Sequence, residues 1–537
     1  MRKIRISVVL SAAVLFGTGL FASAQQDACA ALKKAVAPDV VIESAEQISE
    51  ASAPSASNPA QPPFPKEWKF PAYCRVRGVL HARTGADGAA YGIHFELRLP
   101  TPWNGKFLFQ GGGGTDGVVS PAVGSVNFKD PPALSRGYAV VSTDAGHTGA
   151  ANTAFGREQQ ARLDYAYNAI GEVTRTAKQL LAAYYQKPAS HSYFAGCSNG
   201  GREAMIAVQR YPLEFDGAIA GDPGFRLTHA AIGEAWDTEA FSAIAPVDEE
   251  KRPILSKAFS NSDMALVSKA VLDQCDALDG IKDGEINNVA QCKFDPEILV
   301  CKGDKTPQCL SRQQVDALKR SFNGARDSKG NSIYASWPYD AGISDMGWRV
   351  WKLGTSETGV PNAINSTMGA HATTDYFVHP YVPSLDAAHI DFDKIASQVE
   401  ATHAINDATS TDIGTFAARG GRLLIYEGVS DPVFSANDLI DYYERLAADN
   451  GGVEQVRSIA RLFLVPGMAH CGGGPSTDDF DSLTALEAWV EAGKAPDSLI
   501  ATGRAFPGRT RSLCAYPQYA AYNGSGDSQI AANFTCK

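Results

Sequence analysis

The serine at position 198 lies between two glycines in the pattern Gly196-x-Ser198-x-Gly200. In such a pattern the serine occupies a sharp turn between a strand and a helix, and the glycines leave room for the neighbouring backbone. An apolar stretch at 191–195 precedes the serine, and helical spacing of apolar residues over 202–210 follows it. The pattern alone is weak in a chain with 50 glycines, but this context makes Ser198 a candidate nucleophile.

A serine hydroxyl becomes a nucleophile when a histidine accepts its proton and a carboxylate orients that histidine. Asp431 follows a predicted strand over 423–426, and His470 lies in a glycine-rich loop after a predicted strand over 458–465. Each has an ordinary alternative, since an aspartate before a proline can begin a turn and a lone loop histidine is usually only exposed. Because nucleophile, acid and base follow in the chain order of α/β-hydrolases, we predict a catalytic triad of Ser198, Asp431 and His470.

A run of four glycines at 111–114 follows the predicted strand over 106–109. In α/β-hydrolases a loop at this place donates a backbone N–H to the oxyanion, together with the N–H of the residue after the nucleophile. We therefore predict an oxyanion hole made by Asn199 and the glycine run, with Gly113 and Gly114 as its donors. A phosphate-binding loop is the alternative, but no Gly-Lys-Ser/Thr sequence follows the run.

The elements that must position these residues alternate between strands and helices on both sides of a long interruption. Predicted strands cover 73–82, 93–99, 106–109, 138–144, 191–195, 215–222, 422–428 and 458–465, and predicted helices cover 164–185, 202–210, 436–450 and 480–492. From 223 to about 405 the alternation stops, and helical patterns, four cysteines and loops take its place. We predict an α/β-hydrolase catalytic domain in two parts, 25–222 and 406–537, with a large inserted lid domain at 223–405.

Residues 1–24 have the form of a secretory signal peptide. A basic start is followed by the apolar stretch 6–21 and by Ala22-Ser23-Ala24, a small-residue cleavage site. A membrane anchor is the weaker alternative, because the apolar stretch is short and interrupted. No later apolar segment reaches the roughly 20 residues that span a bilayer. We expect a secreted or periplasmic protein, cleaved near Ala24, without membrane attachment.

Charge and cysteine content limit the classes of partner and compartment. Without the basic residues of the leader, 45 basic and 59 acidic residues remain, a net charge of about −14, so nucleic acid is not an expected partner. All ten cysteines follow the leader, which fits an oxidised, exported protein with up to five disulfides. Residues 25–70 are expected to run over the surface, where Cys29 and Cys74 could pin them. The sequence leaves the oligomeric state open.

Cys197 directly precedes the serine and Cys471 directly follows the histidine, so a disulfide between them would join the nucleophile and base loops. On these Cys-Ser and His-Cys pairs the chain resembles the tannase and feruloyl esterase family over essentially its mature length. On the stretches 110–117 and 196–205 it resembles the members that act on terephthalate monoesters. The resemblance implies the disulfides Cys29–Cys74, Cys197–Cys471, Cys275–Cys292, Cys301–Cys309 and Cys514–Cys536.

An acidic run at 276–285 places hard oxygen ligands in a loop with two glycines, a composition that suits calcium. It is not an EF-hand, because Asn287 stands at the twelfth position instead of glutamate. A solvated acidic turn is the alternative. The resemblance implies a structural Ca²⁺ held by side-chain oxygens of Asp276, Asp279 and Asp283 and by the backbone carbonyls of Ile281 and Glu285.

Two departures from the terephthalate-cleaving members concern the substrate. Those members carry a lid arginine that grips the free carboxylate, whereas this chain has no arginine between Arg349 and Arg419, and Asn199 replaces their acidic residue after the serine. The expected substrate class is therefore broad: feruloyl or other hydroxycinnamoyl esters, gallates or terephthalate monoesters. Three lid aromatics could stack on the ring or only build the lid core, namely Trp348, Trp351 and Phe377.

Together these features predict a secreted serine carboxylic-ester hydrolase that acts on a small aromatic ester through an acyl-enzyme. One alternative is a non-catalytic, calcium-dependent binding protein on a hydrolase scaffold, which turnover of a chromogenic ester would exclude. The other is a serine peptidase, which a comparison of ester with amide substrates would distinguish.

Overall fold

The protein is described from a computed structural model. The description covers the chain except for residues 1–26, 35–38, 53–67, 127–129, 151 and 383–388. The predicted signal peptide at 1–24 therefore lies outside the described residues. No helix within the described part of the chain is long and apolar enough to cross a membrane.

Within the described residues, nine strands form one sheet in the order β1-β4-β5-β7-β6-β8-β9-β10-β11. The strands from β7 to β11 in this order run parallel to one another, whereas β1, β4 and β5 are joined to their neighbours by antiparallel pairing. The bounds are β1 Val40–Ile48, β4 Ala72–Thr84, β5 Ala90–Thr101, β6 Lys106–Gln110, β7 Ala139–Thr143, β8 His191–Cys197, β9 Gly217–Gly221, β10 Arg422–Gly428 and β11 Ala460–Val465. The carboxyl ends of the parallel strands thus meet at one edge of the sheet, where α/β proteins place their sites.

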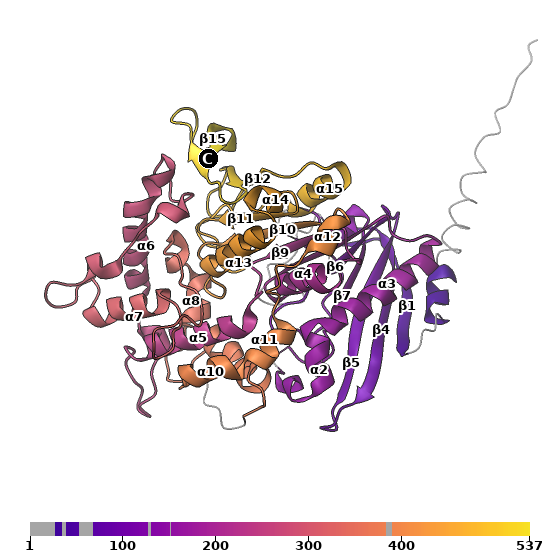
Figure 1. Ribbon diagram of the computed structural model, residues 1–537, viewed down its shortest axis with the longest axis horizontal. Helices are drawn as coiled ribbons and strands as arrows, with labels where there is room; N and C mark the ends of the chain where they lie inside the picture. The colour runs from indigo at the N-terminus through magenta and orange to yellow at the C-terminus, as the bar shows by residue number, and fades with distance from the viewer. Residues whose placement is uncertain (1–26, 35–38, 53–67, 127–129, 151, 383–388) are drawn as a thin grey trace, which may run out of the picture.

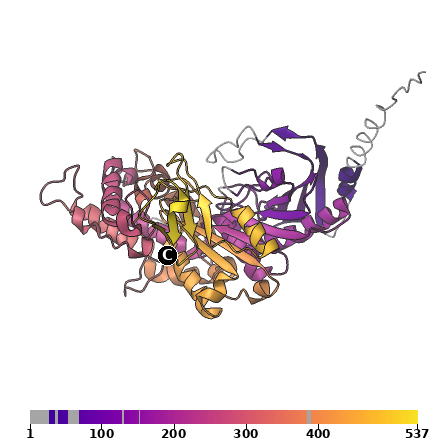
Figure 2. The same ribbon diagram turned by 90° about the horizontal axis from the view of Figure 1, so that it is seen from above.

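Helices cover both faces of this sheet, as Figures 1 and 2 show. Successive side chains of a strand point to opposite faces, and on β6 Phe107 and Phe109 belong to the core under α3, α4 and α13, whereas Leu108 belongs to the core under α15. The helices outside the insertion are α2 Gln159–Leu163, α3 Ala169–Tyr185, α4 Asn199–Arg210, α13 Ala436–Asp449, α14 Val453–Arg457 and α15 Ser482–Ala492. Burial on both faces explains why the central strands are continuous apolar runs.

The chain between β9 and β10 is helical and lies on the side of the sheet away from β1 (Figure 1). Its helices are α5 Leu227–Ser242, α6 Asn261–Cys275, α7 Arg312–Phe322, α8 Met346–Lys352, α9 Ala370–Ala372, α10 Phe392–Gln398, α11 Glu400–Asn406 and α12 Gly414–Ala418, with the π-helices η10 Asn365–Gly369 and η11 Thr373–Phe377. Its apolar residues Phe225 and Leu318 belong to the same core cluster as the sheet. The boundaries predicted for a lid domain, 223 and 405, stay a prediction.

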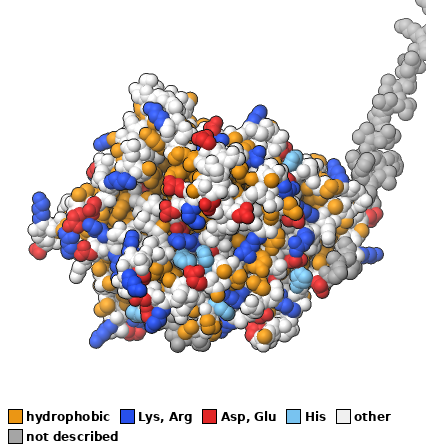
Figure 3. All heavy atoms as spheres, viewed as in Figure 1, with side chains coloured by type: hydrophobic (Ala, Val, Ile, Leu, Met, Phe, Trp, Pro, Cys, Tyr) orange, Lys and Arg blue, Asp and Glu red, His pale blue; other side chains and the backbone are white. Residues whose placement is uncertain are grey.

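Short strand pairs complete the fold. They are β12 Ser498–Ala501 with β13 Arg511–Cys514, β14 Ala520–Tyr522 with β15 Phe534–Cys536, and β2 Ala51–Ser52 with β3 Lys69–Phe70. On the face seen in Figure 3, the coloured acidic and basic side chains are interspersed, and hydrophobic ones are scattered among them.

Two local features were not predicted from the sequence. Within the stretch 25–70, which was expected to run over the surface, Val40–Ile48 forms β1, a partly exposed edge strand paired antiparallel with β4. The reason lies in its apolar, β-branched start, which favours a pleated strand. The predicted helix over 164–185 begins as the π-helix η4, Asp164–Asn168, and continues as α3.

Candidate active site

Ser198 occupies the turn between β8 and α4 with φ 64° and ψ −127°. This conformation is strained for a residue with a side chain, and such strain concentrates at functional sites. A Cβ on Gly196 would lie 2.5 Å from the Gly200 carbonyl oxygen, and a Cβ on Gly200 would lie 2.6 Å from that of Gly112. The two glycines are therefore required by the close approach of backbone around the serine.

The structure brings the three side chains of the predicted triad into one hydrogen-bonded chain. The Nε2 of His470 lies 2.8 Å from Ser198 Oγ, and its Nδ1 lies 2.7 Å from Asp431 Oδ2. The other oxygen of Asp431 accepts the backbone N–H groups of Val433 and Phe434, at 2.6 and 3.1 Å. With Nδ1–H donating to the carboxylate, Nε2 is free to accept the serine proton.

The electrostatic surroundings favour a basic imidazole. Burial acts to lower the pKa of His470, but the charge and hydrogen bond of Asp431, together with the charges of Asp222 and Glu234, outweigh burial. The pKa of His470 therefore lies above its ordinary value, which strengthens this histidine as a proton acceptor.

Five disulfides join the same cysteines as those the resemblance implies. They are Cys29–Cys74, Cys197–Cys471, Cys275–Cys292, Cys301–Cys309 and Cys514–Cys536. The second of these links the residue before Ser198 to the residue after His470, with Cα atoms 6.0 Å apart. It therefore ties the loop of the nucleophile to the loop of the base.

Asp222, which the sequence did not single out, lies beside this disulfide at the end of β9 and is fully buried. Its carboxylate accepts the N–H of Gly428 at 2.7 Å and that of Cys471 at 2.6 Å, and so connects the loops that carry Asp431 and His470. Burial and the charge of Asp431 raise the pKa of Asp222 to about 8. Its position at the carboxyl end of a parallel strand was the available signal.

The glycine run lies against the nucleophile turn, and its amides have different roles. The Gly112 N–H donates to Glu203 at 2.8 Å, and the Gly113 N–H donates to Asp116 Oδ1 at 2.8 Å. The predicted donor Gly113 is therefore engaged within the loop. Asn199 is the first residue of α4, so its N–H has no intrahelical acceptor. Asn199 and Gly114 remain the candidate oxyanion donors.

A network of buried polar side chains supports the glycine run at 111–114. The Asn199 side chain donates to Asp116 Oδ2 at 2.8 Å and accepts from Arg202 Nε at 2.7 Å. The hydroxyl of Tyr165 donates to the Gly114 carbonyl at 3.1 Å. Asn199 thus has a structural role through its side chain as well as a predicted one through its backbone.

The predicted aromatic contacts lie in different places. The ring of Trp351 meets His470 edge-on with centroids 5.1 Å apart, as does Phe434, which the sequence analysis did not name, at 5.4 Å. Phe377 is buried against Tyr376, with ring centroids 5.4 Å apart. Of the three predicted rings, Trp351 is the one that packs against the triad histidine.

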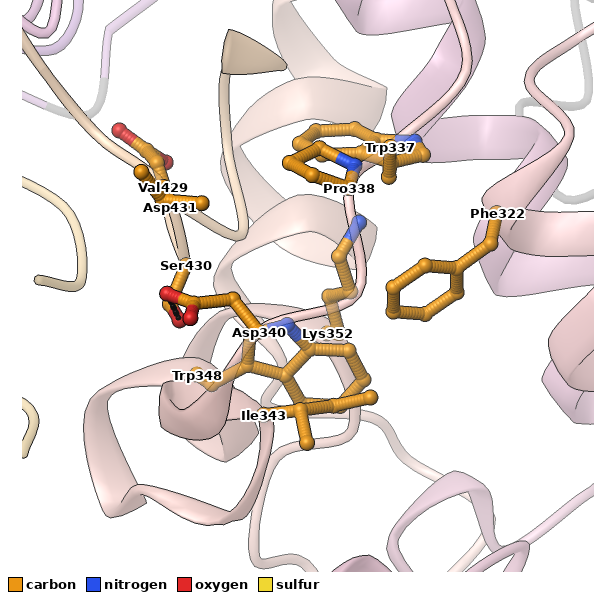
Figure 4. A pocket seen from close by; sticks show the side chains of 10 residues that line it. All are labelled: Phe322, Trp337, Pro338, Asp340, Ile343, Trp348, Lys352, Val429, Ser430 and Asp431. Carbon is orange, nitrogen blue, oxygen red and sulfur yellow. Dashed lines mark hydrogen bonds between the residues drawn. The ribbon is translucent and has the colours of Figure 1, made fainter. Parts of the chain in front are cut away.

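Trp348 lines a small cavity beside the acid loop together with Lys352, Asp340, Ser430 and the triad member Asp431 (Figure 4). The carboxylate of Asp340 accepts the Ser430 hydroxyl at 2.7 Å and the Gly467 N–H at 2.6 Å. A residue of the insertion therefore braces both loops that carry the acid and the base. Trp348 fills space around this brace, as the core alternative for the lid aromatics anticipated.

The residues predicted to bind calcium form a curled loop. Asp276 accepts N–H groups from Asp283 and Gly284 at 3.1 to 3.2 Å, which brings the two ends of the loop together. Burial and the charge of Asp283 raise the pKa of Asp276, and the same causes raise that of Asp279 to about 6. A cation would relieve this excess of buried negative charge, so the donor set fits the ion.

Two arginines pair with Glu285 and with one oxygen of the proposed ligand Asp283, which leaves the other oxygen of Asp283 for an ion. Glu285 pairs with Arg509 at 3.0 Å and with Arg511 at 3.3 Å, and Asp283 Oδ2 pairs with Arg511 at 2.6 Å. Glu285 is thereby left to offer its backbone carbonyl, which is the ligand that the resemblance implies for it.

A sheet of this order, with a serine at its central strand–helix turn and the partners in the order Ser, Asp, His, defines the α/β-hydrolase class. Residues 74–537 match the family described as tannase and feruloyl esterase. The chain therefore belongs to that family and is a carboxylic ester hydrolase.

Individual relatives agree with this assignment. The chain is 42% identical over 562 residues to the mono(2-hydroxyethyl) terephthalate hydrolase of Piscinibacter sakaiensis, covering 96% of this chain and 92% of that protein. It is 30% identical over 461 residues to a probable feruloyl esterase of Arthroderma benhamiae, covering 82% and 81%. The crystal structure of feruloyl esterase B from Aspergillus oryzae has the same fold, with a TM-score of 0.79 at 24% identity over 96% of this chain and 100% of that one.

Proposed function

We propose that the protein is an exported serine esterase that hydrolyses esters of aromatic carboxylic acids through Ser198, His470 and Asp431. The observation that carries the proposal is the hydrogen-bonded chain from Asp431 through His470 to Ser198, with distances of 2.7 and 2.8 Å. Membership of the tannase and feruloyl esterase family supports the same reaction class.

In the proposed mechanism Ser198 Oγ attacks the ester carbonyl carbon while His470 Nε2 takes its proton. The N–H groups of Asn199 and Gly114 donate to the negative oxygen that develops, and Asp431 stays ionised to stabilise the imidazolium. His470 then returns the proton to the leaving alcohol. A water molecule, activated by the same histidine, attacks the acyl-enzyme and releases the acid.

The acyl group is the part of the substrate that the relatives' names have in common. One relative is named for a terephthalate ester and another for a feruloyl ester, and both acids are aromatic. Trp351 and Phe434 lie beside His470, where rings can pack on an aromatic acyl group. Feruloyl or other hydroxycinnamoyl esters, gallates and terephthalate monoesters are therefore the candidate substrates.

Calcium and export belong to the same proposal. Asp276, Asp279 and Asp283 would hold the ion with side-chain oxygens, and Ile281 and Glu285 with backbone carbonyls. The ion would neutralise buried carboxylates and stabilise the loop, and it would supply no step of the ester chemistry. The five disulfides support export, because disulfides persist in oxidising compartments.

A panel of methyl esters of aromatic acids tests the proposal, with each matching amide as a second substrate and Ser198→Ala as the control. The proposed function predicts turnover of esters, much slower turnover of amides and loss of both in the variant. Faster amide than ester hydrolysis would make the protein a peptidase. Absence of turnover for every ester would leave a binding protein on this scaffold.

A further inference from the structure

The carboxyl group of Glu234 is buried near the triad without a partner. Glu234 lies on α5 and is 5% exposed, and among the described residues its carboxyl takes part in no hydrogen bond or ion pair. Its oxygens are not among the side-chain atoms that are both shielded from solvent and unpaired, so part of the carboxyl stays accessible. An accessible and unpaired carboxyl near the triad is able to hydrogen-bond a bound substrate.

Glu234 and Asp237 are two carboxyl groups of α5 that lie near the same ammonium group, that of Lys352. Asp237, about one turn further along α5, accepts hydrogen bonds from Lys352 Nζ and, at 2.6 Å, from the Ser321 hydroxyl. The Lys352 ammonium also lies 3.8 Å from the centre of the Trp337 ring. One ammonium thus faces two carboxyls, and it is bonded to Asp237.

Two close approaches connect Glu234, through neighbouring residues of the insertion, to the oxyanion loop beside the triad. A Cβ built on Gly369 would lie 2.1 Å from Glu234 Oε2, so the carboxyl lies directly against this glycine. Met368, the residue before it, has its sulfur 3.3 Å from a Cβ built on Gly114, the candidate oxyanion donor. The carboxyl therefore lies next to the segment that touches the oxyanion loop.

The electrostatics agree with this position. Burial raises the pKa of Glu234 to about 8; the charges of Asp237 and Asp431 act in the same direction, and those of Lys352 and His470 oppose the rise. The carboxyl is thus close enough to the triad for their charges to interact. Near neutral pH a carboxyl of this kind can both donate and accept a hydrogen bond.

We propose that Glu234 is a specificity-determining residue that hydrogen-bonds a phenolic hydroxyl on the aromatic acyl group of the substrate. The inference rests on the proposed function and narrows its substrate class to hydroxylated rings. A hydroxyl suits the site because it can donate and accept. A ring carboxylate does not, because it would bring a further negative charge beside Asp431 and Asp237, in a chain without arginine between Arg349 and Arg419.

The test compares three methyl esters whose rings differ at one position: methyl 4-hydroxybenzoate, methyl benzoate and monomethyl terephthalate. The measured quantity is the ratio of kcat/KM for the hydroxylated ester to that for the unsubstituted one. Glu234→Leu should lower this ratio about tenfold relative to the wild type, the effect of one lost hydrogen bond. The same variant should not lower Tm, because leucine removes no hydrogen bond or ion pair of the Glu234 carboxyl.

Glu239→Gln is the matched control, since Glu239 lies on the same helix, is 37% exposed and pairs with Arg320 on the outside. It should leave the ratio unchanged. Glu234→Gln should lower the ratio less than leucine does, because its amide oxygen still accepts a hydrogen bond. If Glu234→Leu does not fold, Glu234→Ala takes its place, and a wild-type ratio in that variant overturns the proposal.

The outcomes separate this inference from the proposed function. If the wild type hydrolyses these esters and Ser198→Ala does not, but Glu234→Leu keeps the wild-type ratio, only the role of Glu234 is refuted. Faster hydrolysis of monomethyl terephthalate than of the hydroxylated ester by the wild type also refutes it. If the wild type hydrolyses none of these esters or their amides, the proposed function fails as well.

Discussion

Replacing Cys197 and Cys471 together by alanine should reduce both stability and activity, whereas removing another long-range disulfide should reduce stability alone. Cys197–Cys471 closes a loop with a sequence separation of 274, and Cys29–Cys74 one of 45. In the chain-entropy account these separations correspond to about 5.5 and about 4 kcal/mol of stabilisation. The difference of about 1.5 kcal/mol is small, so the loss of stability hardly distinguishes the two pairs.

The rate should distinguish them, because only Cys197–Cys471 adjoins both Ser198 and His470. A misplacement of about 1 Å between reacting groups can cost about a hundredfold in rate. Asp222 still accepts the Cys471 N–H in the variant, which keeps part of the alignment. We therefore expect kcat/KM to fall about ten- to a hundredfold in Cys197→Ala/Cys471→Ala.

The assay is kcat/KM on a chromogenic aryl ester, measured well below the Tm of both double variants, with urea unfolding as the stability measurement. Cys29→Ala/Cys74→Ala should keep nearly the wild-type kcat/KM at that temperature. The reasoning is refuted if the Cys197 and Cys471 variant is destabilised but fully active, or if both double variants lose the same fraction of activity.

Further predictions concern the base, the acid loops and the ion. Because the pKa of His470 is raised, kcat/KM should fall as pH drops with a midpoint above about 6.5, and a midpoint well below that value contradicts the environment described. Asp222→Asn should lower Tm and lower kcat/KM at least tenfold, because the N–H of Gly428 or of Cys471 loses its acceptor. Unchanged values would show that the acid and base loops do not need the connection through Asp222. A chelator should lower the Tm of the wild type, while Asp279→Asn should show a reduced response, and kcat/KM at low temperature should stay the same in both. If elemental analysis finds no calcium after exposure to millimolar calcium, the ion is absent.

Much of the fold could be predicted from the sequence, because the central strands are short apolar runs separated by helical patterns. The elbow around Ser198 could be predicted because its glycines are local and its strand and helix adjoin it. β1 was missed because an edge strand at 40–48 gains its order from pairing with β4, which lies far along the chain. Asp431 and His470 could be predicted from their order along the chain, because this fold fixes the order of its triad residues.

The rest of the site depends on contacts between distant segments. Asp222 accepts from donors 206 and 249 residues away, so its place at the end of a strand could mark it but its partners could not be predicted. Glu234 could not be singled out from the sequence, because only the structure shows that Lys352 bonds Asp237 and leaves the Glu234 carboxyl without a partner. Trp348 and Trp351 both lie on α8, and packing alone decides that Trp351 meets His470.

The most direct test of the account is to trap the acyl-enzyme. Wild-type protein is mixed with an excess of methyl 4-hydroxybenzoate, quenched in acid within milliseconds to seconds, and analysed by intact-mass spectrometry and peptide mapping. The account predicts a mass increase of one 4-hydroxybenzoyl group, located on the peptide that contains Ser198 and absent from Ser198→Ala. Turnover of the ester by Ser198→Ala, or an adduct on any other residue that forms and decays at the rate of turnover, would contradict it.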